Sequence, residues 1–194
     1  MQLKIASITN LTDARFFSAI GAHYLGFCFD ALDKNNINIA KAKEIINWLY
    51  NPVIVGQFGQ HQTQEEIQFI ADEIGINDIQ IPFNHPQQAQ LGFEKFLTIN
   101  DWTLLSDCLN RNEIQPLVDS LVLKIQPDDI ANNTLKNFIK NNKVFIETAF
   151  TKQNILPLVE TLHPYGIQIT CHAEQKSGIS KVDEYAEILE VLGF

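Results

Sequence analysis

The chain has 194 residues, 45% of them hydrophobic, which is enough for one domain with a full core. Its net charge of −9 and its lack of a lysine or arginine cluster argue against a nucleic-acid partner, and no apolar run approaches the roughly 20 residues of a membrane span. Three cysteines without a CxxC motif argue against a disulfide framework and a structural zinc site. Because MQLKIAS also lacks the features of a signal peptide, we expect a cytoplasmic protein with no metal and no cofactor.

Short apolar runs recur along the whole chain and predict buried strands. They are rich in Val, Ile and Phe and apolar on both faces, which is typical of parallel strands covered by helices. The eight runs span residues 3–8, 24–29, 53–58, 78–83, 96–101, 120–125, 143–148 and 166–171.

Amphipathic segments between these runs predict helices. In the first segment Thr12 is the expected N-cap and Gly21 the stop, while Gly75 ends another. Pro157 predicts that the helix around it begins late or kinks. Helical periodicity covers residues 12–22, 63–75, 151–162 and 180–192, and it is weakest over 85–94.

Eight strand signals that alternate with helical ones predict an α/β fold with a parallel sheet. Eight units favour a closed (β/α)8 TIM barrel, here a small one with shortened loops that occupies residues 1–194 as a single domain. The active site of such a barrel lies at the carboxyl ends of the strands, so we expect any ligand at that mouth.

Two segments near the start of the chain carry a family resemblance. KIASITNLTDA followed by GAHYLGFCF resembles the opening of phosphoribosylanthranilate isomerase, the tryptophan-pathway barrel whose motif is KICGIT. The likeness continues through VIVGQFGQHQTQEEIQFIADEIGINDIQI and returns at GIQITCHAEQKSGISKVDEY. Framework and order match along nearly the whole chain, and the resemblance implies the same barrel.

The resemblance also implies where the family's chemistry would lie. The family performs an Amadori rearrangement of an aminoaldose, with a cysteine base after the first strand and an aspartate acid after the sixth. Those positions hold Ala6 and Lys124 here, and Glu147 stands where a glycine-rich phosphate loop is expected. We therefore expect a divergent member of the family that lacks isomerase activity.

Several side chains at the predicted mouth are candidates for other chemistry. Opposite charges at Lys124 and Glu147 on neighbouring strands predict an ion pair across the mouth. A joint role for Cys171 and His172 is disfavoured, because adjacent strand residues point to opposite faces. A metal held by Cys28, Asp30 and His172 lacks a close-spaced ligand motif. The candidate mouth residues are Lys124, Glu147, Asp30, Gln80, Cys171, His172 and Glu174.

Three functions stay open. The chain binds or transforms a small polar metabolite at the mouth, or it is a non-catalytic protein that acts through its surface or as an oligomer. Alternatively, it still performs the isomerisation with substituted groups. A mouth lined by polar side chains favours the first, and one plugged by Phe83, Phe150 and paired charges favours the second.

Overall fold

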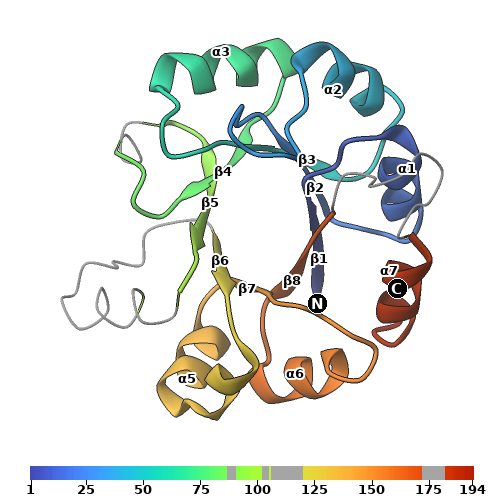
Figure 1. Ribbon diagram of the computed structural model, residues 1–194, viewed down its shortest axis with the longest axis vertical. Helices are drawn as coiled ribbons and strands as arrows, with labels where there is room; N and C mark the ends of the chain where they lie inside the picture. Colours follow the sequence, from blue (N-terminus) through green and yellow to red (C-terminus); the bar gives the residue numbers. More distant parts are fainter. Residues whose placement is uncertain (87–90, 102–104, 106–119, 172–181) are drawn as a thin grey trace.

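In the computed structural model, eight short strands close into one parallel barrel, in which each strand pairs with the next and β8 pairs with β1 (Figure 1). The structure describes residues 1–86, 91–101, 105, 120–171 and 182–194. The strands are Gln2–Ala6 (β1), Tyr24–Cys28 (β2), Val53–Gln57 (β3), Asp78–Pro82 (β4), Glu94–Ile99 (β5), Ser120–Lys124 (β6), Val144–Glu147 (β7) and Gly166–Thr170 (β8). The predicted (β/α)8 barrel and all eight predicted strands are confirmed, with ends that move by one or two residues.

Helices surround the strands as an outer ring (Figure 1). They are Leu11–Ala19 (α1), Ile39–Ile46 (α2), Gln64–Ile74 (α3), Asn133–Asn141 (α5), Ile155–Leu162 (α6) and Val182–Glu190 (α7), with a 3-10 helix at Pro127–Ala131 (η2). Each packs its apolar side on the sheet, as Ile67 and Ala71 do in α3. Within the described part of the chain, no helix is long and apolar enough to cross a membrane.

Local signals explain most helix ends. Thr63 and Glu66 form a capping box at the start of α3, and Gly75 ends that helix at a φ of 77°. Helix α6 begins late, at Ile155, so Pro157 falls in its first turn, where no backbone N–H is needed. The predicted cap of α1 was wrong by two residues: Asn10, rather than Thr12, accepts the hydrogen bond from the backbone N–H of Asp13.

The amino-terminal half of the barrel interior is apolar and aromatic. Val55, Phe96, Val122 and Phe145 form one buried cluster, against which the partly buried Tyr24 packs. The rings of Phe96 and Phe145 meet edge to face, with centroids 5.6 Å apart. This layer closes the barrel from below, so a ligand has access from the carboxyl ends of the strands.

Candidate functional site

A cavity of about 280 Å³ lies at the carboxyl ends of the strands, where a barrel enzyme holds its active site. All eight strands or the residues that follow them contribute to its wall. In chain order from β1 to β8, each strand or the residue that follows it contributes one of these lining residues: Ser7, Cys28, Gln57, Gln80, Thr98, Lys124, Glu147 and Gln168. Phe83 and Phe150 do not line it, so the mouth is polar rather than plugged.

A buried lysine stands at the base of this cavity. Lys4 is 0% exposed, and its ammonium donates hydrogen bonds to the Oε1 atoms of Gln80, at 2.5 Å, and Gln168, at 2.8 Å. The ammonium also lies 5.1 Å from the centre of the Phe96 ring, in the apolar layer below. Lys4 therefore joins the two halves of the interior.

Burial lowers the pKa of Lys4 from 10.5 to about 7, since a buried amine loses the hydration that favours its charged form. The negative charge of Glu147 opposes this effect and raises the pKa of Lys4. Near neutral pH, Lys4 is thus divided between its charged and neutral forms.

The glutamines extend the network around the wall. The Nε2 of Gln80 donates to the hydroxyl of Thr98 at 2.8 Å, and the Nε2 of Gln57 donates to Gln80 at 3.0 Å. The Oε1 of Gln57 in turn accepts from the backbone N–H of Ser7 at 2.7 Å. The polar side chains inside the barrel thus satisfy one another, as buried polar groups must.

Ser7 occupies a backbone position that suits glycine. Its φ is 58°, in the left-handed region, and the resemblance places a glycine of the family there. The hydrogen bond from Ser7 to Gln57 holds this turn against the wall of the cavity. Ser7 keeps the backbone geometry of that position while adding a hydroxyl side chain beside Ala6, which is 1% exposed.

Glu147 is a fixed carboxylate at the mouth. One oxygen accepts from the Nε2 of Gln168 at 2.9 Å, and the other accepts from the hydroxyl of Thr170 at 2.7 Å. Half-buried and lining the cavity, the carboxylate has its orientation set by these two donors. Because both donors come from β8, the β7–β8 wall places this negative charge.

Lys124 lies next to Glu147 without binding it. The two residues are register partners on β6 and β7, as the strand order predicted. The predicted ion pair was wrong: among the residues that the structure describes, no salt bridge joins them. Lys124 is exposed, and Gln168 and Thr170 already donate hydrogen bonds to both oxygens of Glu147, so an ion pair would add little stability. Both charges are left facing the same cavity.

Cys28 and Cys171, the two cysteines within the described residues, are poor nucleophiles in this fold. Burial raises the pKa of the Cys28 thiol to about 11, and it raises the pKa of the Cys171 thiol further. Both therefore stay protonated at neutral pH. His172 and Glu174, both predicted as candidate mouth residues, lie outside the described residues. Within the described ranges, no cluster of three or more His, Cys, Asp or Glu side chains could hold a metal.

Asp30 and Gln80, both predicted at the mouth, line the cavity. The Oδ1 of Asp30 accepts from the backbone N–H of Leu32 at 2.9 Å, and its other oxygen lies against Gly59, where any side chain would collide with it. His85 is buried, at 4% exposure, and its Nε2 contacts the carbonyl oxygen of Gln62 at 3.1 Å. His85 does not line the cavity and belongs to the framework.

Sequence reasoning missed Lys4 and Gln168. A signal for both was present, because side chains two residues apart on a strand share one face. Lys4 precedes Ala6 by two residues on β1, and Gln168 precedes Thr170 on β8. A polar residue inside an otherwise apolar strand is costly unless it is hydrogen-bonded, so it marks an interior polar network.

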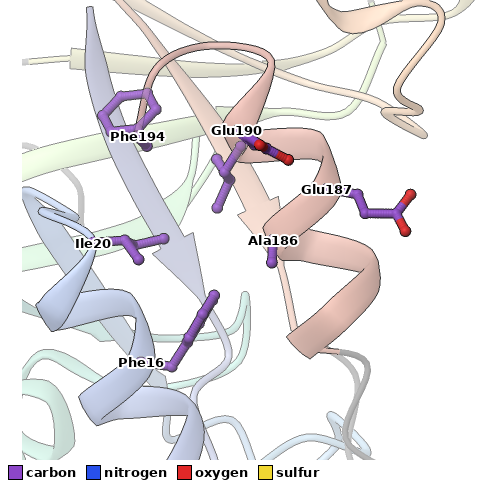
Figure 2. A pocket seen from close by; sticks show the side chains of 7 residues that line it. Phe16, Ile20, Ala186, Glu187, Glu190 and Phe194 are labelled. Carbon is purple, nitrogen blue, oxygen red and sulfur yellow. The ribbon is translucent and has the colours of Figure 1, made fainter.

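A second hollow, of about 440 Å³, lies between α1 and α7 on the outside of the barrel (Figure 2). Phe16, Ile20 and Phe194 give it an apolar surface. Figure 2 shows the carboxylate of Glu187 directed away from Phe16 and Ile20. This hollow brings no reactive groups together, so the mouth of the barrel is the candidate site.

Several known proteins are similar to this chain in sequence or in fold. No protein-family model matches this chain. Over 190 residues the chain is 28% identical to N-(5'-phosphoribosyl)anthranilate isomerase of Chlamydia felis, an alignment that covers 90% of this chain and 87% of that protein. The crystal structure of phosphoribosylanthranilate isomerase from Thermotoga maritima covers 100% of this chain and 98% of its own, with a TM-score of 0.77 and 20% identity.

A further solved phosphoribosyl anthranilate isomerase, in complex with reduced 1-(o-carboxyphenylamino)-1-deoxyribulose 5-phosphate, has a TM-score of 0.79 and 19% identity, and covers both chains fully. This chain folds as a phosphoribosylanthranilate isomerase-like barrel. In this isomerase-like barrel, the resemblance assigns the base position to Ala6 and the acid position to Lys124. The structure buries the first and exposes the second to the cavity.

Proposed function

We propose that this chain is an isomerase that converts an aminoaldose to an aminoketose at the barrel mouth by an Amadori rearrangement. Glu147 acts as the general base and Lys124 as the general acid. The observation that carries the proposal is that these two opposite charges are register partners on β6 and β7, face one cavity and do not bind each other. Neither charge is neutralised by the other, so both act on a ligand in the cavity.

The chemistry needs one proton donor and one proton acceptor. The donor protonates the ring oxygen, the bond between that oxygen and C1 breaks, and C1 becomes doubly bonded to the substrate nitrogen. The acceptor then removes the C2 proton, which gives an enolamine that tautomerises to the aminoketose. No oxidant or reductant is consumed, so an ammonium and a carboxylate at one cavity suffice.

The environment of Glu147 suits a base. Gln168 and Thr170 fix both of its oxygens by hydrogen bonds, so the carboxylate does not have to reorganise when a substrate enters. Lys124 is unburdened by an ion pair and exposed at the cavity, where its ammonium can reach a ring oxygen or an anionic group. The relatives named as phosphoribosylanthranilate isomerases support the same reaction class.

A second candidate is a protein that binds a small polar ligand without isomerising it. Ala6 favours this candidate, because an alanine at the family's base position cannot accept a proton. Asn35 stands near the place where the family has an arginine, and Asp128 and Asp129 follow β6 where a phosphate loop is expected. We expect these changes to weaken the binding of a phosphate group rather than the proton transfer by Glu147.

Turnover of phosphoribosylanthranilate by purified protein separates the two candidates. The protein is produced in a tryptophan auxotroph that lacks its own isomerase, so that no host enzyme contaminates the assay. We expect measurable turnover, with a loss of about 10²- to 10⁴-fold in Glu147→Gln and in Lys124→Met. Glu73→Gln and Lys43→Met are matched controls, since these residues form a salt bridge of 2.7 Å between α3 and α2, outside the barrel.

Binding of the reduced product analogue without any turnover would support the second candidate and refute the first. Rescue of growth without added tryptophan by the wild-type gene, and not by the Glu147→Gln gene, would support the first. Equal turnover in the wild type and in Glu147→Gln would show that another group is the base.

A further inference from the structure

Lys4 dictates the orientation of the two glutamines that it contacts. In its charged form Lys4 carries three donors and no acceptor, so Gln80 and Gln168 both turn their carbonyl oxygens toward it. Their amide nitrogens then point away from the lysine, toward the wall. The Nε2 of Gln80 donates a hydrogen bond to Thr98, and the Nε2 of Gln168 donates one to Glu147.

This arrangement connects a fully buried cation to the carboxylate at the mouth. The path runs from the Nζ of Lys4 to the Oε1 of Gln168, at 2.8 Å, and from the Nε2 of Gln168 to the Oε2 of Glu147, at 2.9 Å. If Gln168 turned over, its carbonyl oxygen would face the carboxylate, and two acceptors would repel each other. Lys4 prevents that turn, because its ammonium would then face a second donor.

We propose that Lys4 is a positioning residue that holds the Glu147 carboxylate toward the barrel mouth through Gln168. Its effect on turnover rests on the proposed function, in which Glu147 is the base. Lys4 itself does not line the cavity and is 0% exposed, so it touches no substrate. Its charge also offsets that of Glu147 inside a barrel where each charge alone would be costly.

The surroundings of Lys4 make its charge state sensitive to Glu147. Gln80 of β4, Gln168 of β8 and Phe96 of β5 are uncharged neighbours, and Glu147 of β7 is the charged group that raises the pKa of Lys4 against the effect of burial. The other titratable groups at the cavity wall are Lys124 of β6, Cys28 of β2, Asp30 and Asp33. Removing the charge of Glu147 should therefore move the titration of Lys4 to lower pH.

The first test needs no substrate. Protein labelled with carbon-13 at lysine Cε is titrated by NMR, and the Lys4 signal is identified by its absence from Lys4→Met. We expect a Lys4 midpoint near pH 7 in the wild type and a lower one in Glu147→Gln. Glu160→Gln, which removes an exposed carboxylate on α6, is the control and should leave the midpoint unchanged. An unchanged midpoint in Glu147→Gln would overturn the proposal.

The second test uses turnover. Lys4→Met and Gln168→Met should each lower kcat by about 10- to 100-fold with little change in KM, because the base is misplaced while binding persists. The double variant should be no slower than the worse single variant, since both break one path. If the fold-losses in kcat of the two single variants multiplied in the double variant, the result would contradict a shared path.

The two tests separate the inference from the proposed function. A wild type without turnover refutes the isomerase assignment, and the NMR titration still decides whether Lys4 and Glu147 are coupled. Turnover in the wild type together with no coupling refutes the role of Lys4 alone. If Lys4→Met fails to fold, Glu147→Gln and Gln168→Met still carry both tests, with the Lys4 signal then identified by its buried, near-neutral titration.

Discussion

The barrel interior has a lower half of apolar side chains and an upper half of polar ones, and the two sets lie two residues apart along the same strands. The lower residues and the residues two positions further along the same strands are Val55 and Gln57, Phe96 and Thr98, Val122 and Lys124, and Phe145 and Glu147. Side chains two positions apart share a face, so both sets point into the barrel. The lower set fills the interior with apolar volume, while the upper set fills it with donors and acceptors.

The difference shows which half serves the fold and which serves a ligand. Apolar packing in the lower half gains free energy in proportion to buried area. The upper half gives up that gain and needs a hydrogen-bond network to offset the cost of buried polar groups. We therefore expect substitutions below to act mainly on stability, and substitutions above to act mainly on chemistry and pH dependence.

The largest stability effect is expected from Phe145→Ala in the lower half. Phe145 is 0% exposed and contacts Phe96, Tyr24 and Tyr165, so its removal leaves a cavity that the rigid barrel cannot fill. Denaturant unfolding should show a loss of about 3–5 kcal/mol. The exposed Phe69→Ala on α3 is the control and should stay within about 0.5 kcal/mol. A loss below about 1 kcal/mol at Phe145 would contradict the assignment of stability to this half.

The next effect is a pH dependence that Lys4 brings to the upper half. Its pKa is about 7 in the folded chain and 10.5 when exposed, so between these values the unfolded chain binds more protons and stability rises with pH. Relative to Lys4→Met, the wild type should gain stability with a slope approaching about 1.4 kcal/mol per pH unit above pH 7. Unfolding of both proteins from pH 6 to 8.5 measures it, and parallel curves would refute a buried, shifted Lys4.

Two glycines sharpen the contrast between the halves. A Cβ at Gly166 would lie 2.5 Å from the Phe145 ring and 2.6 Å from the carbonyl oxygen of Gln2, while one at Gly26 would lie 2.7 Å from the movable side-chain oxygen of Gln57. Gly166→Ala should cost about 1–3 kcal/mol, because ring and backbone cannot both retreat. Gly26→Ala should cost less, since Gln57 can swing away and lose its bond to Ser7. Thermal unfolding of the Gly166→Ala and Gly26→Ala proteins measures the two losses of stability. Equal losses would contradict the idea that side chains in the upper half move more easily than those in the lower half.

The smallest stability effect is expected from Lys124→Met. Lys124 is exposed and has no salt bridge with Glu147, so its removal should change the free energy of unfolding by less than about 0.5 kcal/mol. An ion pair across the mouth would instead have made this substitution costly, because it would leave Glu147 unpaired. If chemical denaturation showed that Lys124→Met lowers the free energy of unfolding by several kcal/mol, the result would support an ion pair between Lys124 and Glu147.

The sequence predicted the barrel well because its signals are local. Eight apolar runs separated by amphipathic segments already define strand number and order, and Gly75 and Pro157 mark helix ends through backbone restrictions. The Lys124–Glu147 register also followed from strand order. Whether those two charges bind depends on competing partners, and Thr170 and Gln168 are contributed by a strand more than 20 residues away from Glu147 along the chain.

The polar network inside the barrel could not be predicted from the sequence, because its residues are far apart along the chain. Lys4 meets Gln80 and Gln168 across 76 and 164 residues, and no spacing motif records such a contact. The alternation of each strand placed these side chains inside the barrel, but only closure of β8 on β1 brought them together. A polar residue at an inward position is the signal that sequence reasoning can use.

Turnover of phosphoribosylanthranilate by the wild type and by Glu147→Gln tests most directly whether the upper half is a working site. We predict turnover by the wild type and a loss of about 10²- to 10⁴-fold when the carboxylate becomes an amide of the same shape. No turnover by the wild type, or equal turnover by both proteins, would contradict it.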